Sequence, residues 1–355
     1  LIACHLLPFF MGSSAAPLLT SYESYPAVFV DVGQGDCLHL RTPGGKHILI
    51  DGGGSAWQGD SRQKNTGRDV LLPYLLHCGA DSLDLALVTH LHADHFQGIA
   101  ELSREIPIAQ LGLYEANRIR ESEVRSQLLG QLPEEIEEKE ADKAGAGQSL
   151  PQLLYLKAGN RIQIESQIYI DVLAPPKQSE EQYRRLAEDD SDENVHYRGM
   201  DILVTGDMGF EGEDRLLDAA GVRIEPPSDT DGRTEEKGFL AQRHPLQAHL
   251  LKVGHHGSRY STGEEFLRAV SPQGAVICTG TNYFGHPSPQ VIALLEKNGI
   301  MVGRTDEHGA VIVDRISGQR ARVKNGNGEL LWHINLKRTN PPKTRSTPIS
   351  ESRNS

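Results

Sequence analysis

Cysteine is scarce in this sequence, and the cysteines that are present form no pattern. The chain has four among 355 residues, with no C-x-x-C pair. Disulfide scaffolds and thiolate metal sites place their cysteines in pairs at short, regular spacing. The four therefore identify neither kind of framework, and each is expected to behave as a small buried apolar residue. They are Cys4, Cys37, Cys78 and Cys278.

Long apolar runs are also lacking. From about Tyr25 onward no stretch approaches the eighteen or so apolar residues that a membrane helix needs, so we expect this part to be soluble. The chain starts with LIACHLLPFFM, which is apolar but too short to span a bilayer. We expect residues 1–24 to be an apolar N-terminal remnant, either the end of a membrane helix or a signal segment.

Positive charge is in short supply over most of the chain. The formal net charge is −12, which argues against a uniformly basic surface that coats nucleic acid. Residues 315–355 differ, because nine Lys or Arg against two Glu give them a net charge of +7 and leave −19 for residues 1–314. We expect 315–355 to be a basic, disordered tail, although such a tail could also contact an anionic polymer or a membrane surface.

Histidine is instead concentrated at one place. The segment VTHLHADHFQG puts three histidines and an aspartate into six residues, after a short apolar run that is typical of a buried strand. In an extended segment alternate residues share a side, so His90 and His92 can converge on one ion while Asp94 and His95 turn toward a second. Zinc, manganese and iron accept such ligands in open catalytic sites. The alternative, a surface loop that is merely histidine-rich, fits this spacing poorly.

Three other predicted strands end in residues of the same kind. The run MDILVTGDM presents Asp207, and a carboxylate there can bridge two cations about 3.5 to 4 Å apart. The run HLLKVGHHGS leads to His255 or His256, and AVICT leads to a loop that carries His286. Possible donors to an anionic group stand close by in sequence, namely Lys252, Ser258 and Arg259.

The remaining pattern predicts the frame of the fold. Strands alternate with helices, which indicates an α/β arrangement with its chemistry at the carboxyl ends of the strands. Asp51 follows a strand and precedes three glycines, so it either lies near the motif or caps the turn, and the two roles are compatible. Acidic insertions are expected near 115–150 and 176–195, the first with a helix near 131–143.

Seven blocks, in the same order, resemble the metallo-β-lactamase superfamily and more narrowly the carboxy-terminal hydrolase domain of the ComEC family of competence DNA-uptake proteins. The resemblance implies an α/β fold of the metallo-β-lactamase type, a four-layer αβ/βα sandwich, in one hydrolase domain over residues 25–314. It also implies two divalent metal ions, Zn²⁺ or Mn²⁺, and phosphodiester hydrolysis of DNA during uptake, with no nucleotide cofactor. The blocks are DVGQGD, LIDGG, THLHADH, TGDM, LLKVGHHGS, FGHPSP and RTDEHGA.

The resemblance assigns roles residue by residue. The metal ligands that it implies are His90 and His92 for the first ion, Asp94, His95 and His255 for the second, and Asp207 as the bridge. His256 is the second choice for the place given to His255. With these ligands, we expect the catalytic residues to be Asp94, Asp207, His286 and Lys252, and the substrate-binding residues to be Ser258, Arg259, His256 and Asn194.

One segment departs from the family pattern. Residues 192–201, DENVHYRGMD, are several residues shorter than the family's turn and strand, so we expect His196 to be a displaced strand residue and not a third ligand of the first ion. A missing strand would expose the edges of its neighbours. This departure motivates one alternative, a non-catalytic DNA-binding module with a degraded metal site.

The second alternative is a hydrolase of esters, thioesters or lactones, because the fold does not determine the substrate. ComEC proteins carry a membrane channel before the hydrolase domain. We therefore expect a domain on the extracellular face of the cell membrane, or a secreted relative.

Overall fold

The structure is a computed structural model. It describes residues 25–54, 65–130, 150–174, 192–197, 199–222 and 244–337, with the backbone alone for 192–197. Several expectations from the sequence lie outside the described residues, namely the apolar segment 1–24, the helix near 131–143, most of the acidic insertion near 176–195 and the chain beyond 337.

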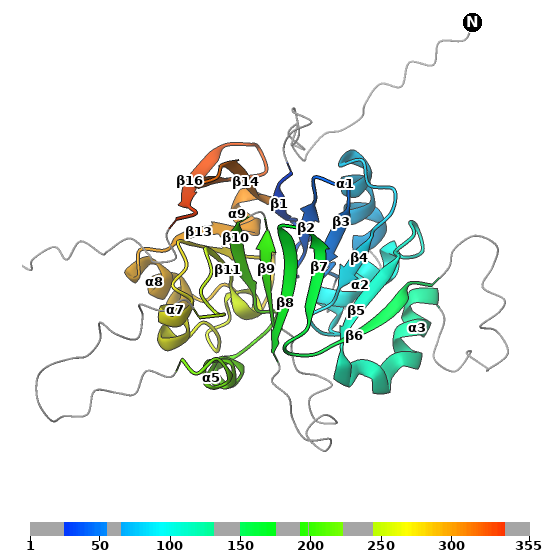
Figure 1. The fold of residues 1–355 in the computed structure, drawn as a ribbon, viewed down its shortest axis with the longest axis horizontal. Coiled ribbons are helices and arrows are strands. Elements are labelled where there is room, and N and C mark those ends of the chain that lie inside the picture. The colour runs from blue at the N-terminus through cyan, green and yellow to red at the C-terminus, as the bar shows by residue number, and fades with distance from the viewer. Residues whose placement is uncertain are drawn as a thin grey trace, which may run out of the picture.

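The protein is built on two facing β-sheets (Figure 1). The nine-stranded sheet has the order β16 (Leu330–Asn335), β15 (Arg320–Lys324), β14 (Val311–Ser317), β1 (Ala27–Phe29), β2 (Leu38–Arg41), β3 (His47–Ile50), β4 (Leu85–Leu87), β5 (Gln110–Tyr114), β6 (Gln152–Leu156). The seven-stranded sheet has the order β13 (Met301–Arg304), β12 (Gly274–Ile277), β11 (Leu250–Lys252), β10 (Met200–Val204), β9 (Asp192–Tyr197), β8 (Ile168–Ala174), β7 (Arg161–Glu165).

Helices cover the outer face of each sheet (Figure 1). Those beside the nine-stranded sheet are η1 (Gly67–Leu71), α1 (Leu72–His77), α2 (Ala93–Leu102), η2 (Glu115–Arg120) and α3 (Glu121–Leu129). Those beside the seven-stranded sheet or at its ends are α5 (Phe210–Ala219), η4 (Gly254–Gly257), α7 (Glu264–Val270), α8 (Pro289–Lys297) and α9 (Thr305–His308). Within the described ranges, none of the helices has both the length and the apolar character needed to cross a membrane.

Alternating side chains along the strands produce the four layers. On β3, Ile48 and Ile50 enter the core between the two sheets, whereas Leu49 faces the helices on the outer side. On β10, Ile202 lies in the core between the sheets and Leu203 packs among α5, α7 and α8. Since successive side chains of a strand point to opposite faces, each sheet is apolar on both sides. The predicted four-layer αβ/βα sandwich is confirmed.

The basic segment after Asp314 is part of the fold as far as residue 337, so the prediction of a disordered tail from 315 onward is wrong for this portion. On β15, Ala321 and Val323 are fully buried in the core between the sheets, while the basic residues occupy the alternate positions. One of these, Arg322, pairs with Asp314 at 2.7 Å. The net charge of the segment gives no indication of this alternation. Lys and Arg at every second position of a strand still leave an apolar face for the sheet.

The segment before Asp207 does contain a strand. The backbone of β9 pairs antiparallel with both β8 and β10, and His196 lies opposite Tyr169 and Asp201. The expectation of exposed neighbouring edges is therefore wrong, since a short strand is sufficient to pair with both neighbours. The sheet is therefore continuous across this segment, and His196 is a strand residue as expected.

A buried carboxylate joins α5 to the start of α7. Glu213 accepts hydrogen bonds from the backbone N–H of Thr262 and, at 2.7 Å, from that of Gly263. Burial raises the pKa of Glu213 to about 7, even though both N–H groups favour the ionised form. The carboxylate thus positions the turn that follows η4.

We expect Glu213→Ala to lower the free energy of unfolding by about 1–3 kcal/mol, because it leaves two backbone donors without an acceptor. Urea denaturation measures the change. Glu211→Ala, at an exposed position of the same helix, is the matched control and should change stability by less than about 0.5 kcal/mol. Equal losses in the two variants would contradict the role given to Glu213.

Candidate metal centre

The three-histidine motif runs from the loop after β4 into the first turn of α2, at the strand-to-helix junction that the sequence predicts. His90 and His92 belong to the connecting loop, and α2 starts at Ala93, so that Asp94 and His95 occupy its first turn. The Nε2 atom of His90 lies 2.9 Å from Nδ1 of His92. Donor atoms of His90, His92 and Asp94 all lie within 4.8 Å of one another. We call these three residues the first donor group.

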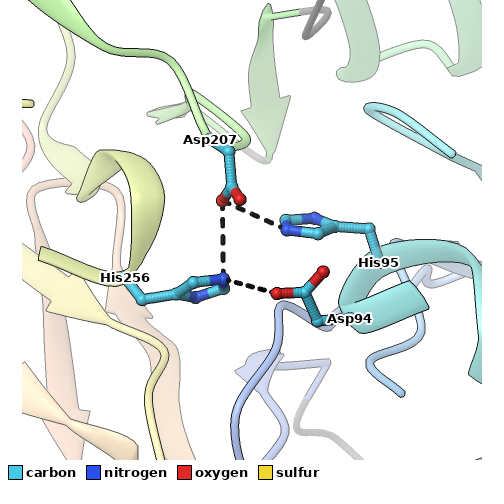
Figure 2. Close-up of side chains that lie close together, drawn as sticks. All are labelled: Asp94, His95, Asp207 and His256. Atoms are coloured by element: carbon cyan, nitrogen blue, oxygen red, sulfur yellow. Dashed lines mark hydrogen bonds and ion pairs between the residues drawn. The ribbon is translucent and has the colours of Figure 1, made fainter. Parts of the chain in front are cut away.

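A second donor group shares Asp94 with the first and contains His95, Asp207 and His256 (Figure 2). Asp207 follows β10, and His256 lies in η4 directly after β11. The Nε2 atom of His256 is 3.3 Å from a carboxylate oxygen of Asp94 and 3.4 Å from Oδ1 of Asp207. The group thus combines side chains from both sheets.

The carboxylate of Asp207 faces both donor groups. Its Oδ1 lies 3.1 Å from Nε2 of His95, as Figure 2 shows, and its Oδ2 lies 3.8 Å from Nε2 of His90. An oxygen toward each group is the arrangement that a bridging carboxylate needs. The carboxylate thus lies where the sequence predicts it, between the two groups, and its bridging of two ions stays a prediction.

His256, and not His255, belongs to the second donor group, which corrects the order of preference derived from the resemblance. The side chain of His256 is buried, whereas that of His255 is 44% exposed and its Nε2 lies 3.8 Å from Asp207. Both residues have positive φ angles, 48° and 53°, so the chain reverses sharply within η4. Consecutive left-handed residues send the two imidazoles in different directions, and this turn cannot be deduced from adjacency in sequence.

Asp51 holds one of the ligands in place from behind. Its carboxylate accepts hydrogen bonds at 2.8 Å from both the backbone N–H and the hydroxyl of Thr89. It also lies 2.8 Å from Nδ1 of His95, whose other nitrogen faces Asp207. A carboxylate on the far nitrogen fixes the tautomer and the ring orientation of a metal-binding histidine. The predicted position near the motif agrees with the structure.

Asp36 was missed by the sequence reasoning, although the block DVGQGD ends on it. It is buried, and its carboxylate lies 3.3 Å from Nδ1 of His256 and 3.8 Å from Nδ1 of His95. Asp36 also forms a buried ion pair with Lys252. The sequence did contain a signal for Asp36, because it lies in a loop beside a strand end. The same kind of position is what predicted Asp207.

Lys252 lies behind the site and does not face a substrate. Its side chain is 2% exposed, and its Nζ donates to the carbonyl of Gly206 at 2.7 Å while pairing with Asp36. A buried ammonium is stable only with such partners. The expectation that Lys252 acts catalytically is therefore wrong in this geometry, because it instead connects the loops that carry Asp207 and Asp36.

The other predicted substrate-binding residues differ in their access. Ser258 is buried, and its hydroxyl accepts the backbone N–H of Tyr260 at 3.3 Å, so it serves the turn. Arg259 is exposed. His286 is partly buried, and its ring centroid lies 5.4 Å from that of His255. Asn194 lies within β9, where side chains fall outside the described structure. Arg259 and His286 thus remain candidates for substrate contact.

The electrostatics of the second donor group favour a bound cation. Burial disfavours a charged imidazole at His256, but the carboxylates of Asp207 and Asp36 outweigh it and raise the pKa to about 10. At His95, burial is likewise outweighed by Asp207 and Asp51, so that the pKa lies well above its usual value. The carboxylates of this centre thus attract positive charge strongly.

The donor atoms also fit a metal ion. Nδ1 of His256 donates to the carbonyl of Cys278 at 2.8 Å, which leaves Nε2 directed toward Asp94 and Asp207. This Nε2 is buried and makes no hydrogen bond to any of the residues that the structure describes. A buried nitrogen that lacks a hydrogen-bond partner beside two carboxylates is the geometry of a ligand to a divalent cation. The residues present therefore match a His and Asp metal site.

The chain is similar to ComE operon protein 3 of Bacillus subtilis (strain 168), with 27% identity over 79% of this chain and 32% of that protein. It is also similar to Competence protein ComA of Neisseria gonorrhoeae, with 33% identity over 32% of this chain and 13% of that protein. The chain spans about a third, or less, of the length of these curated relatives.

Similar solved structures include a mutant of the CmlA beta-hydroxylase, with a TM-score of 0.47 and 12% identity over 84% of this chain and 55% of that one. Another is the Rm3 metallo-beta-lactamase, with a TM-score of 0.32 and 14% identity over 55% of this chain and 72% of that one. The model of the metallo-beta-lactamase superfamily matches residues 30–281. Since this match extends over more than half of the chain, the protein belongs to the metallo-β-lactamase superfamily of metal-dependent hydrolases.

Proposed function

We propose that this protein is a phosphodiesterase that hydrolyses DNA with two divalent ions, Zn²⁺ or Mn²⁺. The observation that carries the proposal is the pair of donor groups that share Asp94 and are both faced by Asp207. Two adjacent cations with a carboxylate between them are characteristic of enzymes that displace an oxygen from phosphorus.

The ligands follow from the distances given above. The first ion would be held by His90 and His92, and the second by Asp94, His95 and His256, with Asp207 between the two. When bound, such ions supply a hydroxide at neutral pH and neutralise charge on the phosphoryl oxygens. The chain's own contribution is to fix the donors before the substrate arrives.

The surrounding residues orient those donors and contact the substrate. Asp51 and the carbonyl of Cys278 each hold one imidazole by its far nitrogen, so the near nitrogens remain directed at the ions. Burial and the neighbouring His255 and His256 lower the pKa of His286, so it is neutral at pH 7. A neutral imidazole beside the centre is able to donate a hydrogen bond to an oxygen of the substrate.

DNA is favoured over an ester, thioester or lactone by the relatives. One of the curated proteins cited above is named a competence protein, and competence is the uptake of DNA. The chain covers only part of each, so the partners of the whole protein are inferred by analogy. We propose that the domain works on the extracellular face of the cell membrane, next to a membrane channel that admits DNA.

Cleavage of DNA should depend on the residues of the metal centre. We expect the protein loaded with Mn²⁺ to cleave a single-stranded oligodeoxynucleotide, and Asp207→Asn to lower kcat at least 100-fold, an order of magnitude typical of losing a group around a catalytic metal. Cleavage is followed on denaturing gels. Asp214→Asn, at an exposed position of α5, is the matched control and should retain full activity. Undiminished cleavage by Asp207→Asn, or faster turnover of a thioester than of DNA, would refute the proposal.

Two adjacent histidines should differ in how much each contributes to metal binding. Because His256 belongs to the second donor group and His255 lies at its edge, His256→Ala should weaken Mn²⁺ binding more than about 100-fold and His255→Ala less than about tenfold. Metal titration monitored by calorimetry measures both. A larger loss in His255→Ala would show that η4 adopts a different turn in the metal-bound protein.

The affinity for a metal ion should depend on pH. The pKa of His256 is about 10 without a metal, and a metal ligand has to be neutral, so an incoming ion must displace a proton at pH 7. Affinity should therefore rise with pH toward about 10 and fall as the pH is lowered. Calorimetry of Mn²⁺ binding in buffers of different ionisation enthalpy should show net proton release. Binding without proton release would contradict the charge balance described here.

A further inference from the structure

Two aromatic side chains stand in solvent beside the metal centre. Tyr283 is 93% exposed and Phe284 is 63% exposed, in the loop between β12 and α8. Aromatic side chains are among the largest apolar groups, and their exposure forfeits the stabilisation that burial would give. Neighbouring exposed aromatics therefore indicate a surface that is covered by something else.

The loop that carries them is held in one conformation. The side chain of Asn282 donates to the carbonyls of Gly280 and His286, at 2.8 and 2.7 Å. Its oxygen accepts the backbone N–H of Phe284 at 3.1 Å and that of His286 at 3.0 Å. With a further, longer hydrogen bond to the hydroxyl of Thr279, at 3.4 Å, this one side chain closes the loop on itself. The two rings are thus presented by an ordered support, which lowers the entropy lost when they bind a ligand.

A chain of ring contacts connects this loop with the metal centre. The ring centroid of Phe284 lies 5.8 Å from that of His286, which in turn lies 6.4 Å from the ring of His256. The loop is also tied to η4, because the backbone N–H of Ser288 donates to the carbonyl of Gly257 at 2.8 Å. A substrate bound at the ions can therefore extend directly onto the aromatic loop.

A cationic group lies on the segment that follows the same turn. Tyr260 is 61% exposed, and the guanidinium of Arg259 lies 4.8 Å from the centre of its ring. The carbonyl of Tyr260 accepts the backbone N–H of Phe210, three residues after Asp207 and itself 46% exposed. Exposed rings and an arginine thus follow the ligand-bearing turns directly.

We propose that Tyr283 and Phe284 form a stacking platform for an unpaired nucleobase of a single-stranded substrate whose phosphodiester lies at the metal centre. Arg259 on Tyr260 contacts the backbone of the same strand. This inference rests on the proposed function and specifies its substrate. Aromatic platforms beside a cationic group are how proteins bind single strands without sequence preference, because every base has a face to stack. A paired base is already stacked within its duplex, so the platform selects unpaired DNA.

The test measures binding, so that it does not depend on cleavage. Fluorescence anisotropy compares a labelled oligo(dT) with an oligomer of the same length made of abasic sites, both without added metal. We expect the double variant Tyr283→Ala, Phe284→Ala to bind oligo(dT) about 5- to 100-fold more weakly and the abasic oligomer unchanged. Phe284→Trp should retain or increase the affinity for oligo(dT). With Mn²⁺ present, the same loss should appear in KM for oligo(dT) and not in kcat.

The control is Ile119→Ala, because Ile119 is 64% exposed, close to the 63% of Phe284, but lies in η2. It should bind both oligomers as the wild type does. Unchanged oligo(dT) binding by the double variant, or an equal loss on the abasic oligomer, would overturn the platform. The platform would also be overturned if the double variant lost binding to anionic phospholipid vesicles and kept its binding to oligo(dT). That result would assign the two rings to a membrane surface. Base-dependent binding without cleavage would instead contradict the proposed function alone.

Discussion

The attraction between the carboxylate of Asp207 and the imidazoles around it holds the whole site together. Its two oxygens lie within 3.1 to 3.8 Å of nitrogens of His90, His95 and His256. Two of these histidines come from the loop and helix after β4, in the nine-stranded sheet, and the third follows β11 in the other sheet. The site therefore exists only where the two sheets are packed together, and the apolar core between them determines its geometry.

A second set of buried charges supports this arrangement from behind. Asp51 and Asp36 contact the far nitrogens of the histidines, and Lys252 balances Asp36 while it binds the backbone just before Asp207. Isolated charges of this kind are costly in a protein interior, but paired and hydrogen-bonded ones are stable. The consequence is a network in which His95 and His256 are each oriented by a partner, so these donors need little rearrangement to accept an ion.

The rim of the site contrasts with its interior. The charged groups behind the ligands are buried and paired with one another, whereas the loop after β12 presents Tyr283 and Phe284 to solvent on a support fixed by Asn282. Ordered loops on a rigid scaffold are where recognition groups are generally found. In this protein the interior supplies the chemistry of a metal centre, and the rim supplies the surface on which substrates are distinguished.

Much of this could be predicted from local sequence. The motif HLHADH lies at a strand-to-helix junction, where extended geometry pairs His90 with His92 and the first helical turn carries Asp94 and His95. These relations span a few residues and follow from the periods of strand and helix. Asp207 was predicted on the same local ground. The alternation in β15 was equally local, but the charges beside Ala321 and Val323 concealed it.

Tertiary structure alone decided which of two adjacent histidines belongs to the metal centre and which charged side chains are buried. His255 and His256 are adjacent in sequence, and only the left-handed turn of η4, packed against Cys278 and Asp94, selects His256. Lys252 can be buried because it forms an ion pair in the interior with Asp36, which is far away in the sequence. The sequence by itself determined the chemical types of the ligands and the strand ends that carry them. Which of the candidate residues become ligands depended on contacts between segments far apart in the sequence. The periodicity of side chains along a strand or helix carries no information on such contacts.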